Sequence, residues 1–160
     1  ARREFPTTIV IRSRESIDYL PEPDIFHDIF GHVPLHADPI FADFLQTYGK
    51  AAVSTDDPHH TERLARLFWF TVEFGLIREG GRNRLYGSGL ISSPGESAHA
   101  LDSKDVDRRP FDLETVCNTS FEIDHYQPIL YVLESFDQLR DAMNTYAQRL
   151  LDPARRPVNA

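Results

Sequence analysis

A single carboxylate inside a strongly apolar segment places the tightest constraint on how this chain folds. Glu73 lies within LFWFTVEFGLI, where almost every neighbour is aliphatic or aromatic. Burying a charged carboxylate without a partner is costly, so Glu73 must be protonated, paired with a cation or bound to a metal. Arg66 and Arg78 are the cations near enough in sequence to serve as that partner.

The segment PEPDIFHDIFGHVPL supplies candidate metal ligands, His27 and His32, five positions apart. On a straight α-helix such positions differ by about 140° in direction and about 7.5 Å in rise. The two rings can therefore meet one ion only if the helix ends or bends between them, and Gly31 lies in that interval. The spacing differs from the i, i+4 pair of the zinc-protease motif H-E-x-x-H.

Together, His27, His32 and Glu73 form a ligand set that leaves half of an octahedral shell open. On Fe(II) the set would leave a single net positive charge and three positions for water, dioxygen or substrate. Zinc also binds such a set and would use it to activate water. The residue types therefore predict a mononuclear metal site, while iron, zinc and a purely structural histidine pair all remain open.

Composition narrows the class of protein. The 160 residues suit a single domain over residues 1–160, with a frayed tail at 152–160. The net charge of −8 argues against nucleic acid and anionic membranes as partners. The only cysteine, Cys117, excludes an intrachain disulfide and fits a reducing, cytoplasmic location. No apolar run approaches the roughly 20 residues of a membrane span, and the absence of sustained heptads favours a monomer.

Hydrophobic periodicity and capping residues predict a mainly α fold with a small, irregular β portion. We expect residues 7–12 to be extended and residues 84–97 to form a turn-rich hairpin or loop. A strand is expected within residues 127–136. Helices are expected at 25–32, with Asp24 as cap and an end near His32 before Pro34, and at 40–50, with Asp38 as cap. A longer helix is expected at 62–80, where Gly80 and Gly81 end it. Two more are expected, one shortly after Asp112 and one at 136–151.

Three segments in this order, PEPDIFHDIFGHVPL, FWFTVEFGL and YGSGLISSPGE, closely resemble the catalytic domain of the pterin-dependent aromatic amino acid hydroxylases, most of all the bacterial phenylalanine 4-monooxygenases. The similarity runs from about Phe5 to about Phe136. It implies a catalytic domain that lacks its N-terminal part. It also implies Fe(II) and a tetrahydropterin as cofactors, and an aromatic amino acid and dioxygen as small-molecule partners. The implied reaction is the hydroxylation of L-phenylalanine to L-tyrosine, a step of phenylalanine catabolism.

The resemblance also implies roles for individual residues. It assigns the iron to His27, His32 and Glu73, and pterin contacts to Asp28 and Ala65. Arg12 would grip the substrate carboxylate and be held by Asp24. Catalytic support near the ligands falls to Ser92 and Glu96. The wall of the aromatic pocket would comprise Pro23, Trp69, Phe74, Gly89 and Ile123, of which the apolar Ile123 favours phenylalanine over tyrosine.

Three other functions compete with this one. A zinc-dependent hydrolase could use the same ligands with Glu96 as its base. A fragment of a hydroxylase could keep the amino-acid pocket without turning over. A purely structural helical domain would need no metal at all.

Overall fold

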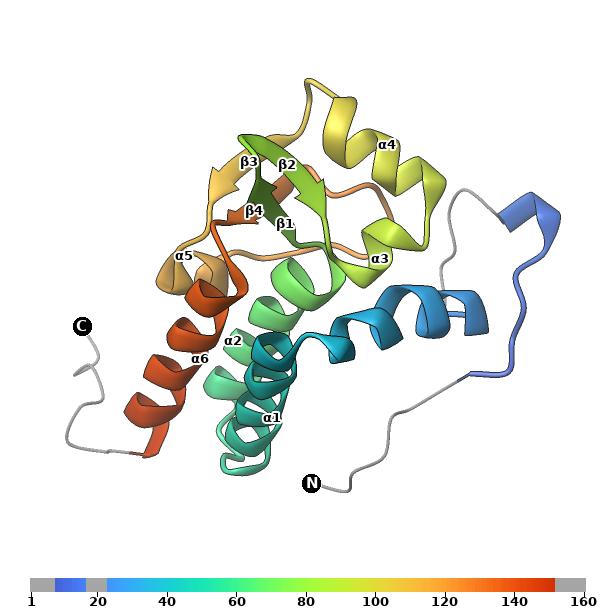
Figure 1. Cartoon of the computed structure of the whole chain (residues 1–160). Coiled ribbons are helices and arrows are strands. Elements are labelled where there is room, and N and C mark those ends of the chain that lie inside the picture. Colours follow the sequence, from blue (N-terminus) through green and yellow to red (C-terminus); the bar gives the residue numbers. More distant parts are fainter. Residues whose placement is uncertain (1–7, 17–22, 152–160) are drawn as a thin grey trace.

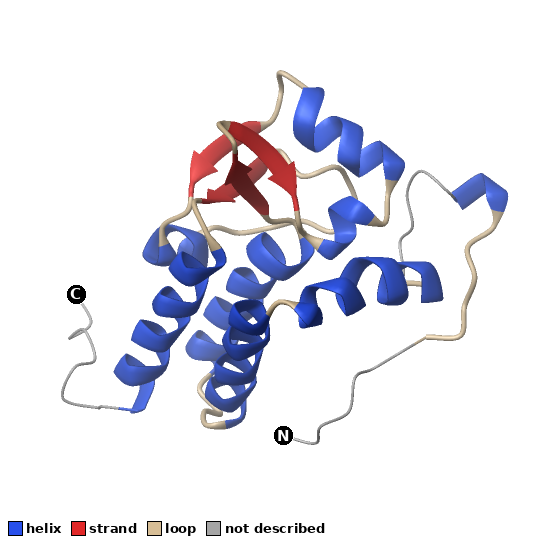
Figure 2. Ribbon diagram, viewed as in Figure 1, coloured by secondary structure: helices blue, strands red, loops and turns tan. Residues whose placement is uncertain are grey.

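The structure is a computed structural model that describes residues 8–16 and 23–151. A small sheet lies above a group of long helices (Figure 1). Most of the described chain is helical, and the strands come only after residue 75 (Figure 2). The helical elements are η1 (Arg14–Ser16), η2 (His27–His32), η3 (Val33–Ala37), α1 (Pro39–Val53), α2 (Pro58–Phe68), η4 (Trp69–Glu73), α3 (Ser88–Ile91), α4 (Pro94–Asp102), α5 (Leu113–Asn118) and α6 (Phe136–Leu151). The strands are β1 (Leu76–Glu79), β2 (Arg82–Leu85), β3 (Asp107–Pro110) and β4 (Ile129–Leu133). The predicted class, mainly α with a small β portion, is confirmed.

The sheet has the strand order β2-β1-β4-β3. β1 and β2 form an antiparallel hairpin, whereas β4 runs parallel to both β1 and β3. Gly80 and Gly81 close the hairpin with φ values of 57° and 76°. Positive φ at both central residues is the requirement of a type I′ turn, which matches the twist of the flanking strands.

This hairpin corrects the prediction of one helix over residues 62–80. The helical path ends at Glu73, and Phe74 departs from it with φ −126°. Gly75 then lies so close to the ring of Tyr86 that a Cβ atom there would come within 2.2 Å of it. The apolar run was compatible with a buried helix or a buried strand, and its second half forms β1.

The helix starts follow capping chemistry. Asp38 accepts hydrogen bonds from the backbone of Ile40 (2.8 Å) and Phe41 (3.0 Å). Asp112 accepts one from the backbone of Thr115 (2.8 Å), and both predicted caps are confirmed. α2 begins at Pro58, earlier than predicted, because Asp57 caps it.

One further prediction was wrong. Residues 84–97 form the end of β2, α3 and the first turn of α4 rather than a loop, because Ser93 caps α4 ahead of Pro94. The expected helix end near His32 is confirmed, because η2 ends there, although Val33 keeps helical angles (φ −58°, ψ −43°) and η3 follows directly. Pro34 falls in the first turn of η3, where a missing N–H costs no hydrogen bond.

The main core lies among α1, α2 and α6, with α1 packed directly on α6. A smaller apolar cluster joins the sheet to α3 and α4. Fully buried members of the two clusters include Phe41, Phe44, Leu67, Leu139, Met143, Leu76, Leu90 and Leu130. Among the described residues, no helix is long and apolar enough to cross a membrane.

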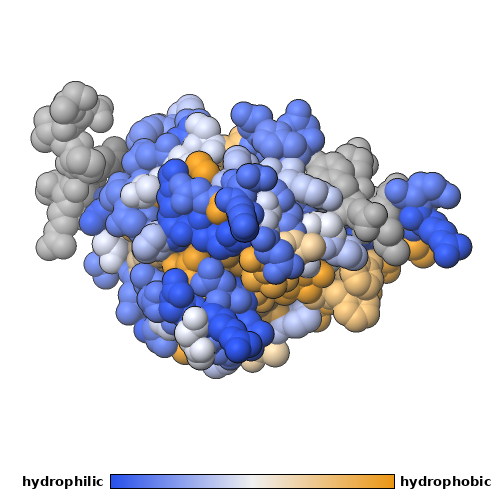
Figure 3. Space-filling view, turned by 90° about the horizontal axis from the view of Figure 1, so that it is seen from above, coloured by the Kyte–Doolittle hydropathy of each residue, from blue (hydrophilic) through white to orange (hydrophobic). Residues whose placement is uncertain are grey.

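The surface seen from above is largely hydrophilic, in keeping with the net charge of −8, but a hydrophobic band crosses it (Figure 3). Large apolar side chains that remain exposed include Ile29, Phe30 and Val33, near the outer side of the helical turns that carry the two histidines. The ligands themselves are far less exposed, with His27 at only 8%.

Candidate metal centre

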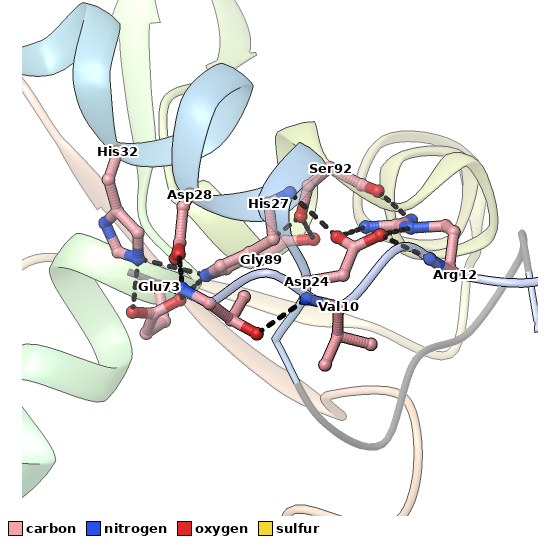
Figure 4. A network of polar contacts seen from close by, with 10 residues as sticks. Val10, Arg12, Asp24, His27, Asp28, His32, Glu73, Gly89 and Ser92 are labelled. Carbon is pink, nitrogen blue, oxygen red and sulfur yellow. Dashed lines mark hydrogen bonds and ion pairs between the residues drawn. The ribbon is translucent and has the colours of Figure 1, made fainter. Parts of the chain in front are cut away.

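His27, His32 and Glu73 bring their donor atoms together at one point (Figure 4). The Nε2 atoms of the two histidines are 3.0 Å apart. Glu73 Oε2 lies 3.5 Å from His27 Nε2, and Glu73 Oε1 lies 3.2 Å from His32 Nε2. The structure therefore brings the three sequence-predicted ligands into one cluster.

The local helix geometry explains how residues five apart converge. η2 is a π-helix, in which each backbone N–H bonds five positions back, so that residues five apart lie about one turn apart on the same side. The rings of His27 and His32 meet edge to face with centroids 4.7 Å apart. Glu73 ends a second π-helical turn, η4. Wide turns of this kind recur at functional sites.

The spacing of the donor atoms fits one ion. Two ligands about 2.1 Å from a metal are about 3.0 Å apart at a right angle and about 3.4 Å apart in a tetrahedron. The three separations found here, 3.0, 3.2 and 3.5 Å, span these values. Two imidazoles and a carboxylate are also the donor set of facial-triad iron sites. The residues therefore fit a divalent ion bound on one side and open on the other.

Each histidine ring is held by a serine hydroxyl at Nδ1, the ring nitrogen that does not face the cluster. His27 Nδ1 lies 2.8 Å from Ser92 Oγ, and His32 Nδ1 lies 2.9 Å from Ser88 Oγ. Burial lowers the pKa of His27, although the nearby Glu73 carboxylate works in the opposite direction. A depressed pKa favours the neutral imidazole that a metal requires.

Neither arginine considered as a partner of Glu73 reaches it. Arg66 pairs with Glu62 one turn earlier on α2. Arg78 on β1 contacts Glu134, which follows the neighbouring strand β4, at 3.2 Å. Among the described residues, the contacts of the Glu73 carboxylate are thus the two histidines, and the three side chains together could hold a metal ion.

Arg12 and Asp24 form a two-pronged ion pair beside the ligands. Arg12 donates from Nε to Asp24 Oδ2 and from an Nη to Asp24 Oδ1, both at 2.8 Å. A third bond, of 2.6 Å, runs from Arg12 to the carbonyl of Ser92. The Arg12 guanidinium holds the pKa of Asp24 well below its usual range. Asp24 also accepts from the His27 backbone (2.9 Å), which confirms its predicted role as a cap.

An aromatic wall stands next to Glu73. The Trp69 ring stacks on Phe121 at 4.4 Å and packs on Phe74 at 4.6 Å. Gly89 lies against this wall, because a Cβ there would come within 2.9 Å of the Phe74 ring. Trp69 Nε1 donates to Gln127 Oε1 at 2.9 Å. The wall is therefore rigid and apolar, as a pocket for a ring requires.

The remaining predicted residues are more scattered. Asp28 is buried and accepts a 2.8 Å bond from the Thr8 backbone. Ala65 is exposed on α2, and Pro23 is exposed before η2. Ile123 is 67% exposed in the segment before β4. The roles of Ala65, Pro23 and Ile123 rest on the resemblance.

Glu96 is buried in the first turn of α4, with 4% exposure. Its Oε2 atom has no hydrogen-bond partner among the described residues. Burial raises the pKa of Glu96 to about 7, opposed by the Gln127 backbone N–H and by His125. The group is thus a carboxyl poised to exchange a proton near neutral pH.

Ser88, Phe121 and Gln127 were not identified from the sequence. Phe121 and Gln127 lie far from Trp69 along the chain, so local patterns give no sign of their contacts. Ser88 offered one weak signal, since it precedes Ser92 by four positions and shares its side of a helical turn.

Comparisons with known proteins agree with this geometry. The family model for biopterin-dependent aromatic amino acid hydroxylases matches residues 1–158. The phenylalanine-4-hydroxylase of Mesorhizobium japonicum is 46% identical, over 96% of this chain and 60% of its own length. That of Chromobacterium violaceum is 49% identical, over 89% of this chain and 48% of its own length. The chain therefore spans about half the length of the curated relatives it matches.

Solved structures give the same result. The C. violaceum phenylalanine hydroxylase with bound Fe(III) matches with a TM-score of 0.86 and 46% identity, over 96% of this chain and 56% of that chain. A structure of the same enzyme with iron(III) and 7,8-dihydrobiopterin matches with a TM-score of 0.85, at the same identity and coverage.

Proposed function

Because this chain belongs to the biopterin-dependent aromatic amino acid hydroxylases, we propose that it is an iron- and tetrahydropterin-dependent monooxygenase that converts L-phenylalanine to L-tyrosine. The observation that carries the proposal is the convergence of His27, His32 and Glu73, with donor atoms 3.0 to 3.5 Å apart. Iron and a reduced pterin supply the activation of dioxygen when both are bound. The protein supplies the binding, the orientation and a dry pocket.

Arg12 orients the substrate. Three of its five N–H groups are used by Asp24 and Ser92, and an arginine has further donors that suit a carboxylate. Asp24 holds the guanidinium in plane, so that the arginine does not need to be ordered when the amino acid binds. This arrangement supports recognition of the α-carboxylate and places the substrate ring beyond it.

The aromatic wall accepts the ring. Trp69 and Phe74 present apolar faces next to Glu73, and Gly89 leaves room for Phe74 to lie flat. Pro23 and Ile123 complete the pocket in our proposal. The apolar Ile123 favours phenylalanine, since a bound phenol would require a polar partner.

Asp28 and Ala65 are proposed to face the pterin, and Ser92 and Glu96 to support the reaction. Ser92 holds the His27 ring. Glu96, with its pKa raised to about 7, is able to hold or release a proton near neutral pH. The relatives are about twice as long as the matched segment, so we propose that the matched segment contributes only part of the pterin site.

The zinc-hydrolase alternative is not favoured. It requires the same ligands, but the homologous proteins are named as hydroxylases, and solved relatives hold iron and dihydrobiopterin. We also propose that the protein is a cytoplasmic monomer, as its single cysteine and lack of heptads predict. Light scattering that gave a stable tetramer would contradict the monomer.

The test is tyrosine formation by the purified protein supplied with Fe(II), a tetrahydropterin and L-phenylalanine. Glu73→Gln is expected to abolish both iron binding and tyrosine formation. Glu79→Gln, which changes an exposed carboxylate on β1, is the matched control and should change neither. Iron and phenylalanine binding without any tyrosine would identify an amino-acid-binding fragment instead. Equal activity of Glu73→Gln and the unchanged protein would overturn the proposed site.

A further inference from the structure

Ser88 occupies a position in the centre that mirrors Ser92. It is fully buried, and its hydroxyl lies 2.9 Å from His32 Nδ1, on the side of the ring that faces away from Glu73. Ser92 holds His27 Nδ1 at 2.8 Å in the same manner. Each histidine ligand is therefore fixed by one buried serine, and both serines come from the α3 turn.

The pairing of two serines with two histidines depends on the spacing of turns in α3 and in η2. Ser88 and Ser92 are one α-helical turn apart, since the Ser92 backbone N–H bonds to the Ser88 carbonyl at 3.1 Å. His27 and His32 are about one turn apart on the π-helix η2. The two serines are therefore spaced so that Ser92 meets His27 and Ser88 meets His32. Gly31 brings them into contact, because it has no Cβ to strike Ser88.

The hydroxyl group has a property that a carbonyl or carboxylate lacks, because it both donates and accepts. The two Nε2 atoms at 3.0 Å require that one of them carries a hydrogen when no ion is bound. If that imidazole is neutral, its Nδ1 is a bare acceptor, which the serine O–H can satisfy. When Nε2 is bound to a metal, Nδ1 carries the hydrogen and donates to the same oxygen.

We infer that Ser88 is a positioning residue of the metal centre, which holds His32 with its Nε2 toward the ion and accommodates both tautomers of the ring. This inference rests on the proposed metal site. It assigns to Ser88 the same task that Ser92 performs for His27. Because both serines are neutral, they fix the rings without adding negative charge to a site that already contains Glu73.

The experiment compares Ser88→Ala with Ser92→Ala and with Ser97→Ala. Ser97 is the matched control, because its hydroxyl bonds to the Leu90 carbonyl and not to a histidine. Each folded variant, checked by circular dichroism, is titrated with Co(II), and the visible absorption of the bound ion is followed. Ser88→Ala is expected to lose about 10- to 100-fold in Co(II) affinity, the usual effect of removing a partner of a metal ligand. Ser97→Ala should bind as the unchanged protein does.

Proton NMR of the Co(II)-loaded protein provides a second readout that a general loss of stability would not mimic. Two solvent-exchangeable, paramagnetically shifted N–H signals are expected, one from each ligand imidazole. Ser88→Ala should speed the exchange of one signal and Ser92→Ala that of the other. Wild-type affinity and unchanged signals in Ser88→Ala would overturn the inference. If Ser88→Ala failed to fold, the His32 signal would be identified as the one that Ser92→Ala leaves unchanged, and its rapid exchange in the unchanged protein would overturn the inference.

These results distinguish a failure of the role of Ser88 from a failure of the proposed metal site. A protein that binds no Co(II) or Fe(II) before any substitution would refute the metal site itself. A protein that binds the ion normally but is indifferent to Ser88→Ala would refute only the role of Ser88.

Discussion

Gly31 lies against Ser88 so closely that a Cβ on Gly31 would come within 2.9 Å of both the Cβ and the carbonyl oxygen of Ser88. The segments that carry the histidines and the serines therefore meet backbone to backbone. A side chain at this point would have to push α3 away from η2. The contact sets the distance over which the serines reach the imidazoles.

Gly31→Ala should therefore weaken metal binding together with stability. We expect a loss of about 1–3 kcal/mol in the free energy of unfolding, as for other overpacked sites, measured by urea titration. Co(II) affinity should fall as well, because both serine–histidine distances depend on the contact. Gly49→Ala is the control, since nothing lies within 4 Å of a Cβ in that helical position. It should stabilise the protein by about 0.5–1 kcal/mol, and equal behaviour of the two variants would contradict the close contact.

Asp24→Asn should impair substrate binding more than turnover. The neutral amide cannot hold Arg12 through two charge-assisted bonds, so the guanidinium loses its fixed orientation. We expect the KM for phenylalanine to rise by about tenfold, the equivalent of about 1.4 kcal/mol, with a smaller change in kcat. Asp141→Asn, on the exposed side of α6, is the control. An unchanged KM in Asp24→Asn would show that Arg12 does not hold the amino acid.

Glu96→Gln should remove a pH dependence of stability. The pKa of Glu96 is raised from 4.5 to about 7 by burial, so the folded state holds its proton more tightly than the unfolded chain does. Stability from this group is complete below pH 4.5 and is lost as the pH rises to about 7, by at most about 3 kcal/mol. Gln keeps the size and shape of the side chain without the charge.

The measurement is the free energy of unfolding of both proteins between pH 5 and pH 8. The difference between Glu96→Gln and the unchanged protein should shift in favour of Gln as the pH rises. A difference that stayed constant over this range would show that Glu96 titrates at its ordinary pKa in the folded state.

Gln127→Met should loosen the aromatic wall. Gln127 is 2% exposed, accepts from Trp69 Nε1 and donates to the carbonyls of Glu122 and His125. Losing these bonds should cost about 1–3 kcal/mol, since buried polar groups are left without partners. Trp69 is the only tryptophan, so its fluorescence reports the change directly, and we expect a shift to longer wavelength. Gln148→Met, exposed on α6, should leave the spectrum unchanged.

The sequence allowed much of the centre to be predicted because its chemistry is unusual. A carboxylate within an apolar run and a histidine pair near a glycine are costly unless they have partners. The convergence of His27 and His32 was harder to derive, because local patterns do not distinguish a π-turn from an α-turn. The hairpin after Phe74 was missed for a related reason, since an apolar run suits helix and strand alike.

Contacts between distant segments account for what the sequence did not reveal. Ser88 meets His32 across 56 positions, and Gln127 meets Trp69 across 58. Serine and glutamine occur widely on protein surfaces, so neither residue type indicates such a role. Caps at Asp38 and Asp112 were predictable because a cap acts on its own next turn.

The order of these pieces along the chain has a consequence for biosynthesis. His27 and His32 leave the ribosome 65 and 56 positions ahead of the serines that hold them, and Glu73 follows in between. A nascent chain thus exposes both imidazoles long before anything fixes their direction. The two rings are therefore held in their final directions only once α3 has docked on η2, late in the synthesis of this part of the chain.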